Sequence, residues 1–270
     1  MKDLRSAYGE YAIVTGASSG IGEQFARQLA ARGVNLVIVA RGKAKLDALA
    51  HELHAQHGTT VHVVELDLLN PGAVDELARR TRQLDVGVVI ANAGNYASGS
   101  FLHNDLATEM DVLTLNAAVP VQIAHQFGRQ FARRRRGGII LISSTVGAGP
   151  APYLANYAAA KAYILSLGQA LNYEFKKAGV DLLVVSPGPT KTEGAEQAEG
   201  IDFSKLPLPM MSPDKVARTG LKKLGKRGHV IVGAPNKIMD FMGKYLTPRT
   251  ISKRMYGRLL YSALSPDNRG

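Results

Sequence analysis

Thr15-Gly16-Ala17-Ser18-Ser19-Gly20-Ile21-Gly22 is the stretch that decides the fold of this chain. The apolar, β-branched run at 11–14 before it predicts a buried strand. The four-residue spacing of Ile21, Phe25 and Leu29 after it predicts a helix. Glycines at such a turn let the backbone approach a pyrophosphate, which the free amides of the helix N-terminus stabilise. The predicted cofactor-binding residues of this turn are Gly16, Ser18, Ser19, Gly20 and Ile21.

Further buried strands alternate with helical segments along the chain. Strands are predicted at 34–41, 60–66, 86–90, 139–142, 181–185 and 229–232, and helices at 45–57, 111–133, 162–176 and 213–224. This alternation predicts an α/β, doubly wound Rossmann fold with a parallel sheet of about seven strands. With 270 residues and no visible boundary, residues 1–270 are expected to form a single domain.

Composition excludes several classes of site. The chain has no cysteine, which rules out disulfides, thiolate catalysis and zinc-thiolate sites. The first six residues lack the apolar core of a signal peptide, and no apolar run reaches the ~18 residues that span a bilayer. We expect a cytoplasmic protein. The net charge is +11, and residues 214–270 hold 13 Lys and Arg against three Asp.

Chemistry-bearing residues follow the predicted strands at their carboxyl ends, which meet at one edge of a parallel sheet. The second strand ends in Ala40-Arg41, where a guanidinium in place of a carboxylate favours a 2′-phosphate and therefore NADP(H). An exposed strand-end charge is the alternative for Arg41. The fourth strand is followed by Asn92-Ala93-Gly94. Asn92 is expected to form hydrogen bonds across strand ends, and Gly94 permits close backbone approach. At or just after these ends lie Arg41, Asp67, Leu68, Asn92, Ala93, Gly94, Pro187, Gly188, Thr190 and Thr192, which the family resemblance given below implies as cofactor contacts.

Tyr157 and Lys161 are four residues apart at the start of the predicted helix that continues through 162–176. They therefore share one face of that helix. An ammonium at roughly 4 Å would lower the pKa of the tyrosine by about three units, close to working pH. Two amphipathic residues at the edge of a buried helix are the structural alternative. Asn116 is predicted to be buried within the helix at 111–133, where a polar amide needs hydrogen-bond partners.

Taken together, these motifs resemble those of the short-chain dehydrogenase/reductase family over roughly residues 10–195. The glycine turn, Asn92-Ala93-Gly94 and Pro187-Gly188 with Thr192 look like its cofactor motifs. Asn116, Ser144, Tyr157 and Lys161 resemble the catalytic tetrad of this family. Ser144 is preferred to Ser143 because its spacing from Tyr157 agrees with the family. One departure is Ala91, where the family often has asparagine.

The resemblance implies a mechanism and a partner set. Ser144 would bind the substrate oxygen, Tyr157 would protonate it, and Lys161 would lower the tyrosine pKa and hold the nicotinamide ribose. Asn116 would anchor a water that relays the proton through Lys161. Tyr157 and Lys161 would therefore also contact the cofactor, Asp67 the adenine, and Thr192 the phosphates or carboxamide. The family also implies a homo-oligomer, a dimer or tetramer, through the helices that carry Asn116 and Tyr157.

Residues 189–212 are expected to close over the substrate, and the Leu, Pro and Met residues at 206–211 suit an apolar ligand. The basic C-terminal extension at 236–270 has an apolar stripe at helical spacing. We expect this stripe to pack on the core, a neighbouring subunit or the substrate entrance; the alternative is peripheral contact with anionic lipid. The tail also resembles that of reductases related to 17β-hydroxysteroid dehydrogenases and long-chain 3-ketoacyl reductases, which favours a bulky apolar ketone.

The leading hypothesis is an NADPH-dependent reductase of a small-molecule carbonyl, with NADP⁺-dependent alcohol oxidation as the reverse direction. A NADP-binding regulator or scaffold with little turnover is the alternative from another class. Nucleic-acid binding by the basic tail ranks last, because no aromatic residues are interleaved with its charges in a recognisable motif. Two further clusters have simple structural explanations at helix ends: His51, His54 and His57 rather than a metal site, and Arg133 to Arg136 rather than an anion patch.

Overall fold

The computed structural model describes residues 3–193, 200–202, 205, 210–265 and 268. Seven parallel strands form one sheet, as the sequence predicted, and their order is β3-β2-β1-β4-β5-β6-β7. The order reverses between β1 and β4, which creates the switch point where α/β sheets bind ligands. The strands are β1 (Tyr11–Thr15), β2 (Asn35–Ala40), β3 (Val61–Glu65), β4 (Val86–Ala91), β5 (Gly137–Ile142), β6 (Val180–Ser186) and β7 (His229–Ile231).

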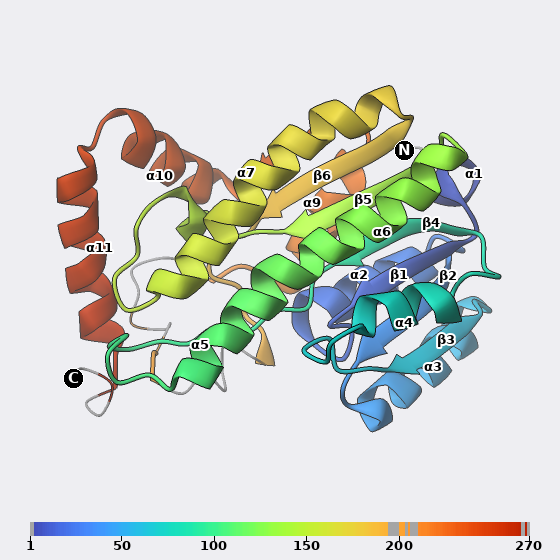
Figure 1. The fold of residues 1–270 in the computed structure, drawn as a ribbon, viewed down its shortest axis with the longest axis horizontal. Helices are drawn as coiled ribbons and strands as arrows, with labels where there is room; N and C mark the ends of the chain where they lie inside the picture. Colours follow the sequence, from blue (N-terminus) through green and yellow to red (C-terminus); the bar gives the residue numbers. More distant parts are fainter. Residues whose placement is uncertain (1–2, 194–199, 203–204, 206–209, 266–267, 269–270) are drawn as a thin grey trace.

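Helices cover both faces of this sheet (Figure 1). The helices named here are α1 (Leu4–Tyr8), α2 (Gly20–Ala30), α3 (Lys43–His57), α4 (Ala73–Arg80), α5 (Leu106–Leu113), α6 (Val119–Arg133), α7 (Ala155–Lys177), α9 (Pro213–Lys223), α10 (Ala234–Tyr245) and α11 (Arg249–Ala263). Helices α4, α6 and α7 cover one face, and α2, α3 and α9 cover the other.

The central strands are apolar on both faces, and alternate residues enter different cores. Val14 packs in the core under α2 and α9, whereas its neighbour Ile13 packs in the core under α4, α6 and α7. Side chains alternate across a pleated strand, so a strand covered on both sides needs apolar residues at every position. This requirement explains the continuous apolar runs that identified the strands.

The helix predicted at 111–133 is longer and is not uniform. It begins at Leu106 as α5, continues as a π-helical turn, η1 (Thr114–Ala118), and then becomes α6. A π-helical turn widens the backbone spiral and is frequent at functional sites. Asn116 lies in this turn, fully buried.

The C-terminal extension forms α10 and α11 at one end of the molecule, beyond α7 (red in Figure 1). Leu260, Ala263 and Leu264 pack with Ala151, Leu154 and Ile201 in a small separate core. Within this chain, the core covers only part of the expected apolar stripe. Its members Ile238, Phe241, Met242, Tyr245, Leu246, Ile251 and Met255 are exposed. No helix among the described residues is both long and apolar enough to cross a membrane.

Candidate active site

A cleft of about 1670 Å³ opens at the carboxyl ends of the strands. Sites for drug-sized ligands occupy about 300–1,000 Å³, so this cleft has room for a dinucleotide and a substrate together. All the residues predicted from the sequence as catalytic or cofactor-binding line it. The tertiary structure therefore brings together segments that lie up to 176 positions apart, from Gly16 to Thr192.

The glycine turn between β1 and α2 forms one wall of the cleft. Gly16 has a φ of 66°, and a Cβ atom there would lie 2.9 Å from the Asn92 side-chain nitrogen. The Asn92 amide donates to the backbone oxygens of Thr15 and Gly16 at 3.0 and 3.3 Å. This confirms the predicted hydrogen bonds across strand ends. The Thr15 hydroxyl, which sequence analysis did not select, accepts from the backbone N–H groups of Asn92 and Ala93.

The next wall follows β2 and β3. Arg41 is exposed at the end of β2 and lines the cleft. Lys45, in the first turn of α3, also lines it and forms an ion pair with Glu193, with Nζ to Oε1 at 2.6 Å. Sequence analysis missed Lys45, whose signal was a second cation four residues after Arg41. Asp67 accepts a 3.0 Å hydrogen bond from the Leu69 N–H, which fixes the turn after β3, and Leu68 is buried beside it.

Asn116 is held by three acceptors. Its Nδ2 donates to the backbone oxygens of Asn95 and Val112, at 2.7 and 2.9 Å, and lies 3.1 Å from Asn95 Oδ1. Its buried Oδ1 has no hydrogen-bond partner in the part of the chain that the structure describes. A Cβ atom on Gly94 would lie 2.6 Å from this oxygen and 3.6 Å from Lys161 Nζ. The free acceptor of Asn116 therefore faces the space beside the lysine ammonium.

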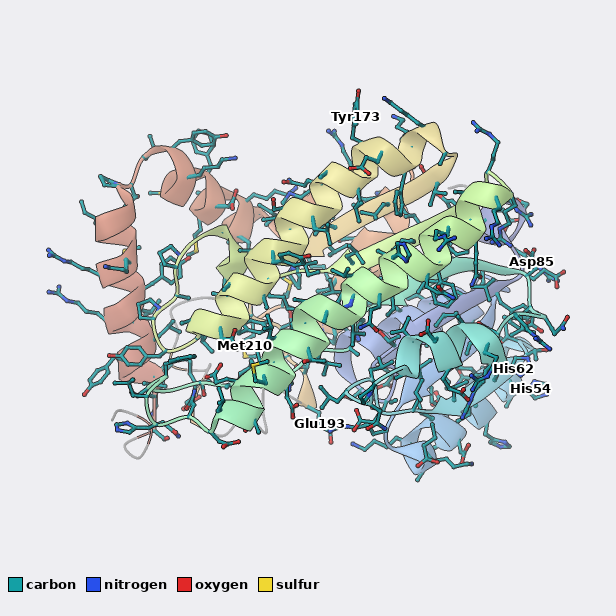
Figure 2. All side chains as sticks on the ribbon, viewed as in Figure 1. His54, His62, Asp85, Tyr173, Glu193 and Met210 are labelled. Atoms are coloured by element: carbon teal, nitrogen blue, oxygen red, sulfur yellow. The ribbon has the colours of Figure 1, made fainter. Side chains whose placement is uncertain are left out.

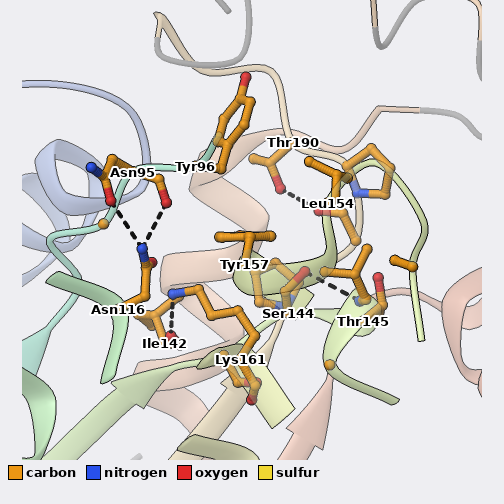
Figure 3. Close-up of a pocket in the computed structure, with 18 of the residues that line it drawn as sticks. Asn95, Tyr96, Asn116, Ile142, Ser144, Thr145, Leu154, Tyr157, Lys161 and Thr190 are labelled. Atoms are coloured by element: carbon orange, nitrogen blue, oxygen red, sulfur yellow. Dashed lines mark hydrogen bonds between the residues drawn. The ribbon is translucent and has the colours of Figure 1, made fainter. Parts of the chain in front are cut away.

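Ser144, Tyr157 and Lys161 meet at the centre of the cleft (Figure 3). Ser144 follows β5 and begins the short 3₁₀ helix η2 (Thr145–Ala148), accepting from the Val146 N–H at 3.3 Å. The same hydroxyl forms a hydrogen bond with Tyr157. Lys161 Nζ donates to the Ile142 carbonyl at 2.9 Å and lies 5.6 Å from the centre of the Tyr157 ring. In contrast, the Ser143 hydroxyl points away and donates to the backbone oxygen of Lys161 at 2.7 Å.

The electrostatics differ from the sequence-based expectation. Burial raises the pKa of Tyr157 to about 12, although the hydrogen bond with Ser144 lowers it. Burial also lowers the pKa of Lys161 to about 8. The prediction that Lys161 brings the tyrosine pKa close to neutrality is therefore wrong for this structure. Desolvation disfavours the charged form of each group and is the main cause of both shifts.

The loop after β6 forms another wall of the cleft. The Thr145 N–H donates to the Pro187 carbonyl at 2.9 Å, and the Thr190 hydroxyl donates to the Gly188 carbonyl at 2.8 Å. Thr192 packs against the glycine turn, since a Cβ on Gly20 would lie 2.9 Å from its methyl group. Within the predicted substrate loop, residues 194–199, 203–204 and 206–209 lie outside the described residues.

The remaining part of the cleft is lined by both apolar and polar side chains, among them Gln169, His229 and Asp240. The Tyr96 ring meets the Tyr157 ring edge to face, with centroids 5.8 Å apart. Tyr96 was not among the residues predicted from the sequence, although it lies two residues after the motif Asn92-Ala93-Gly94. Apolar side chains from η2, the following loop, α10 and α11 complete this part: Val146, Leu154, Met239, Leu259 and Leu260.

The arginine run, Arg133 to Arg136, lies at the amino ends of the strands, whereas the cleft lies at their carboxyl ends. Arg134 and Arg136 both bind the Asp85 carboxylate, at 2.7 and 3.0 Å, just before β4. Asp85 is labelled in Figure 2. Arg134 caps the end of α6 and also donates to the Val86 carbonyl. This arrangement agrees with helix capping. The ion pairs also join the end of α6 to the start of β4, which the sequence did not predict.

The histidine cluster has a similar structural explanation. His54 Nδ1 lies 3.1 Å from the Thr59 carbonyl at the end of α3. Among the described residues, no group of three or more His, Cys, Asp or Glu side chains is placed to hold a metal ion.

Residues 10–200 match the short-chain dehydrogenase family. The chain is a short-chain dehydrogenase. The sequence resemblance is thus confirmed, and with it an oxidoreductase that acts on CH–OH groups. A 7β-hydroxysteroid dehydrogenase from Collinsella aerofaciens is 32% identical over 242 residues, covering 87% of this chain and 90% of the relative.

Solved structures of short-chain dehydrogenases agree with this assignment. A structure concerned with 7β-hydroxysteroid dehydrogenase stereoselectivity has a TM-score of 0.84 at 29% identity, covering 95% of this chain and 98% of the other. A short-chain dehydrogenase from Sphingobium yanoikuyae in complex with NADPH has a TM-score of 0.77 at 33% identity, with 87% and 92% coverage.

Proposed function

We propose that this short-chain dehydrogenase is an NADPH-dependent reductase of bulky, apolar ketones. The observation that carries the proposal is the meeting of the Ser144 and Tyr157 hydroxyls, with Lys161 behind them, in a cleft large enough for a dinucleotide and a second ligand. Two hydroxyl donors beside one another suit a carbonyl oxygen that gains negative charge during reduction.

The residues present fit a dinucleotide. The tight approach of Gly16 to Asn92 leaves a cradle that a Cβ atom would fill, and the N-terminus of α2 points its free amides toward it. Arg41 and Lys45 place two cations on the ribose side of the cleft, which favours the 2′-phosphate of NADP(H) over the 2′-hydroxyl of NAD(H). The NADPH complex of the Sphingobium relative supports the same cofactor.

The cofactor, when bound, supplies the hydride. Tyr157 holds its proton at neutral pH because burial keeps its pKa high, so it can give that proton to the carbonyl oxygen. Ser144 donates a hydrogen bond to the same oxygen and stabilises the charge that develops there. The Lys161 ammonium stabilises the tyrosinate that remains, and the free Oδ1 of Asn116 can hold a water that returns a proton through the lysine.

The lining supports a bulky apolar substrate. Tyr96 contacts Tyr157, and the cleft that holds Tyr157 is also lined by Leu154, Met239, Leu259 and Leu260. Burial of these surfaces against a rigid fused-ring or long-chain ligand would supply the binding free energy. The 7β-hydroxysteroid dehydrogenase activity named for the Collinsella relative supports this class of substrate.

The reverse direction, oxidation of a secondary alcohol with NADP⁺, uses the same groups with Tyr157 as the base. A NADP-binding regulator or scaffold is the weaker alternative, because such a role does not require the complete set of Asn116, Ser144, Tyr157 and Lys161 in one cleft. We place the enzyme in the cytoplasm.

A homo-oligomer, a dimer or tetramer, is part of the proposal. Three exposed apolar residues of α5, namely Leu106, Met110 and Leu113, accompany the exposed Tyr163 of α7. These belong to the two helical segments that carry Asn116 and Tyr157, and a second copy would cover them.

The test combines cofactor binding with turnover. NADPH and NADH are titrated, and oxidation is followed at 340 nm with ketones graded from small to steroid-sized, using wild type and Tyr157→Phe. Tyr173→Phe, an exposed tyrosine on the same helix, is the matched control. The proposal is supported if wild type prefers NADPH and the large ketones, and if turnover is lost in Tyr157→Phe but not in the control. Binding of NADPH with no turnover of any ketone would favour the regulatory alternative.

A further inference from the structure

Helix α10 presents its apolar face to solvent and its polar face to the protein. Ile238, Phe241, Met242 and Tyr245 are 49–64% exposed and lie on one side of the helix. Asn236, Met239, Asp240 and Gly243 occupy the other side and line the cleft. An amphipathic helix of a globular protein normally packs its apolar stripe on the core, so this orientation is reversed. The aromatic rings of Phe241 and Tyr245 also contact one another, at 5.0 Å between centroids.

The exposed apolar surface continues around the corner into α11. Leu246, between the helices, is 67% exposed, and Ile251 and Met255 are each 55% exposed. We call these seven residues the docking face: Ile238, Phe241, Met242, Tyr245, Leu246, Ile251 and Met255. Contiguous apolar surface of this kind marks a site of interaction with another molecule.

Charge identifies the class of that molecule. Residues 234–263 contain six Lys or Arg and a single acidic residue, Asp240, which lines the cleft. Lys237, Lys244, Lys253, Arg254 and Arg258 are exposed on the same two helices, and Lys244 also lines the cleft. A second copy docked through the same two helices would bring these basic residues against their counterparts, because α10 and α11 carry a single acidic residue. A partner with an apolar interior and an anionic boundary would complement both the apolar side chains and the positive charge of the docking face.

We propose that the docking face binds an anionic lipid bilayer, with the apolar side chains among the acyl chains and the basic residues at the headgroups. The opposite sides of the same helices close the cleft through Met239, Leu259 and Leu260. Docking therefore places α10 and α11, which form one wall of the cleft, against the membrane. An apolar ketone dissolved in the bilayer then has a short path to Tyr157; this second step rests on the proposed function.

The test of docking is cosedimentation of the full chain with large vesicles of phosphatidylglycerol and phosphatidylcholine, compared with phosphatidylcholine alone. It needs no cofactor or substrate, so its outcome is separate from that of the reductase proposal. We expect binding to the anionic vesicles, weakening with added salt, and little binding to the neutral vesicles.

Two double variants, each with a matched control, separate the contributions. Lys237→Glu with Arg254→Glu should weaken vesicle binding by at least about 25-fold, because each basic residue contributes about fivefold. Lys215→Glu with Lys222→Glu, exposed on α9, makes the same change in net charge elsewhere. Phe241→Ser with Tyr245→Ser should weaken binding by at least about tenfold. Leu102→Ser, 90% exposed in a loop, controls for loss of exposed apolar surface.

Equal binding of wild type and both docking-face variants would overturn the proposal, as would binding that ignores lipid charge. A decrease in oligomer size by light scattering in Phe241→Ser with Tyr245→Ser, without lipid, would instead identify a second copy as the occupant and also overturn it. For the second step, the same variant should keep wild-type turnover of a water-soluble ketone and lose turnover of a vesicle-embedded one.

Discussion

The Ser143 hydroxyl donates a 2.7 Å hydrogen bond to the backbone oxygen of Lys161. This bond joins the end of β5 to the middle of α7, within the turn that carries Tyr157 and Lys161. The neighbouring Ser144 hydroxyl instead faces the cleft and contacts Tyr157. Two adjacent serines thus have different tasks, one in positioning the helix and one at the reacting groups.

Replacement of the two serines should separate these tasks. Ser144→Ala should lower kcat/KM for ketone reduction by about 10²- to 10³-fold, because one donor to the developing oxyanion is lost. Ser143→Ala should lower the free energy of unfolding by about 1 kcal/mol, because a buried hydrogen bond is lost. Steady-state kinetics and urea denaturation of both variants measure the two effects. A larger kinetic loss in Ser143→Ala would reverse the assignment.

Lys161→Met should reveal the free energy that wild type loses by burying a cation. Burial lowers the pKa of Lys161 to about 8, so the penalty is complete below pH 8. Between pH 8 and the unfolded-state pKa near 10.4, the folded lysine is neutral while the unfolded chain still binds the proton. Wild-type stability should therefore rise with pH over this range, by on the order of 3 kcal/mol, relative to Lys161→Met.

Urea denaturation at intervals between pH 7 and pH 10 measures that difference. Lys176→Met, exposed on the same helix, controls for the removal of one positive charge. A stability difference between wild type and Lys161→Met that stays constant with pH would show that the ammonium is not desolvated.

Gly94→Ala should disturb the catalytic geometry without removing a catalytic side chain. The new methyl group would lie 2.6 Å from Asn116 Oδ1, so the asparagine or the backbone must move. We expect kcat to fall by about 10²-fold, the scale of a misplacement near 1 Å. Gly42→Ala, where an added Cβ meets nothing within 4 Å, is the control, and similar kcat values for the two variants would contradict the prediction.

Arg41→Asp should reverse the cofactor preference. A carboxylate at the end of β2 repels a 2′-phosphate and accepts from a 2′-hydroxyl, so KM should rise at least about 10²-fold for NADPH and fall for NADH. The control is Lys43→Ala, whose lysine pairs with Asp47 and lies outside the cleft lining. Equal effects on the two cofactors would mean that Arg41 is simply an exposed charge.

Asp85→Asn should weaken the fold at the edge far from the cleft. It removes the charged partner of Arg134 and Arg136, in pairs that are about one-third exposed. We expect a loss of about 1 kcal/mol in the free energy of unfolding and unchanged kcat and KM. Thermal unfolding and steady-state kinetics test this, and a change in KM for NADPH would instead indicate a role in anion binding.

The sequence by itself determined the sheet, the glycine turn and the family. Apolar runs such as β1 and β5 are local signals, because a strand buried on both faces must be apolar at every position. Parallel strands also place their carboxyl ends together, so residues such as Asn92 and Thr192 could be assigned to one edge without knowledge of their contacts.

Only the tertiary structure decided the pKa values of Tyr157 and Lys161, the π-helical turn at Asn116 and the outward orientation of Phe241 and Tyr245. Spacing along a helix fixes which residues share a face, but not which environment that face meets. Desolvation depends on segments remote in the chain that enclose the site, and it can outweigh the attraction between neighbouring charges. The apolar stripe of α10 likewise had the spacing of a core-packed helix, and only its position at the rim of the cleft showed that it faces outward.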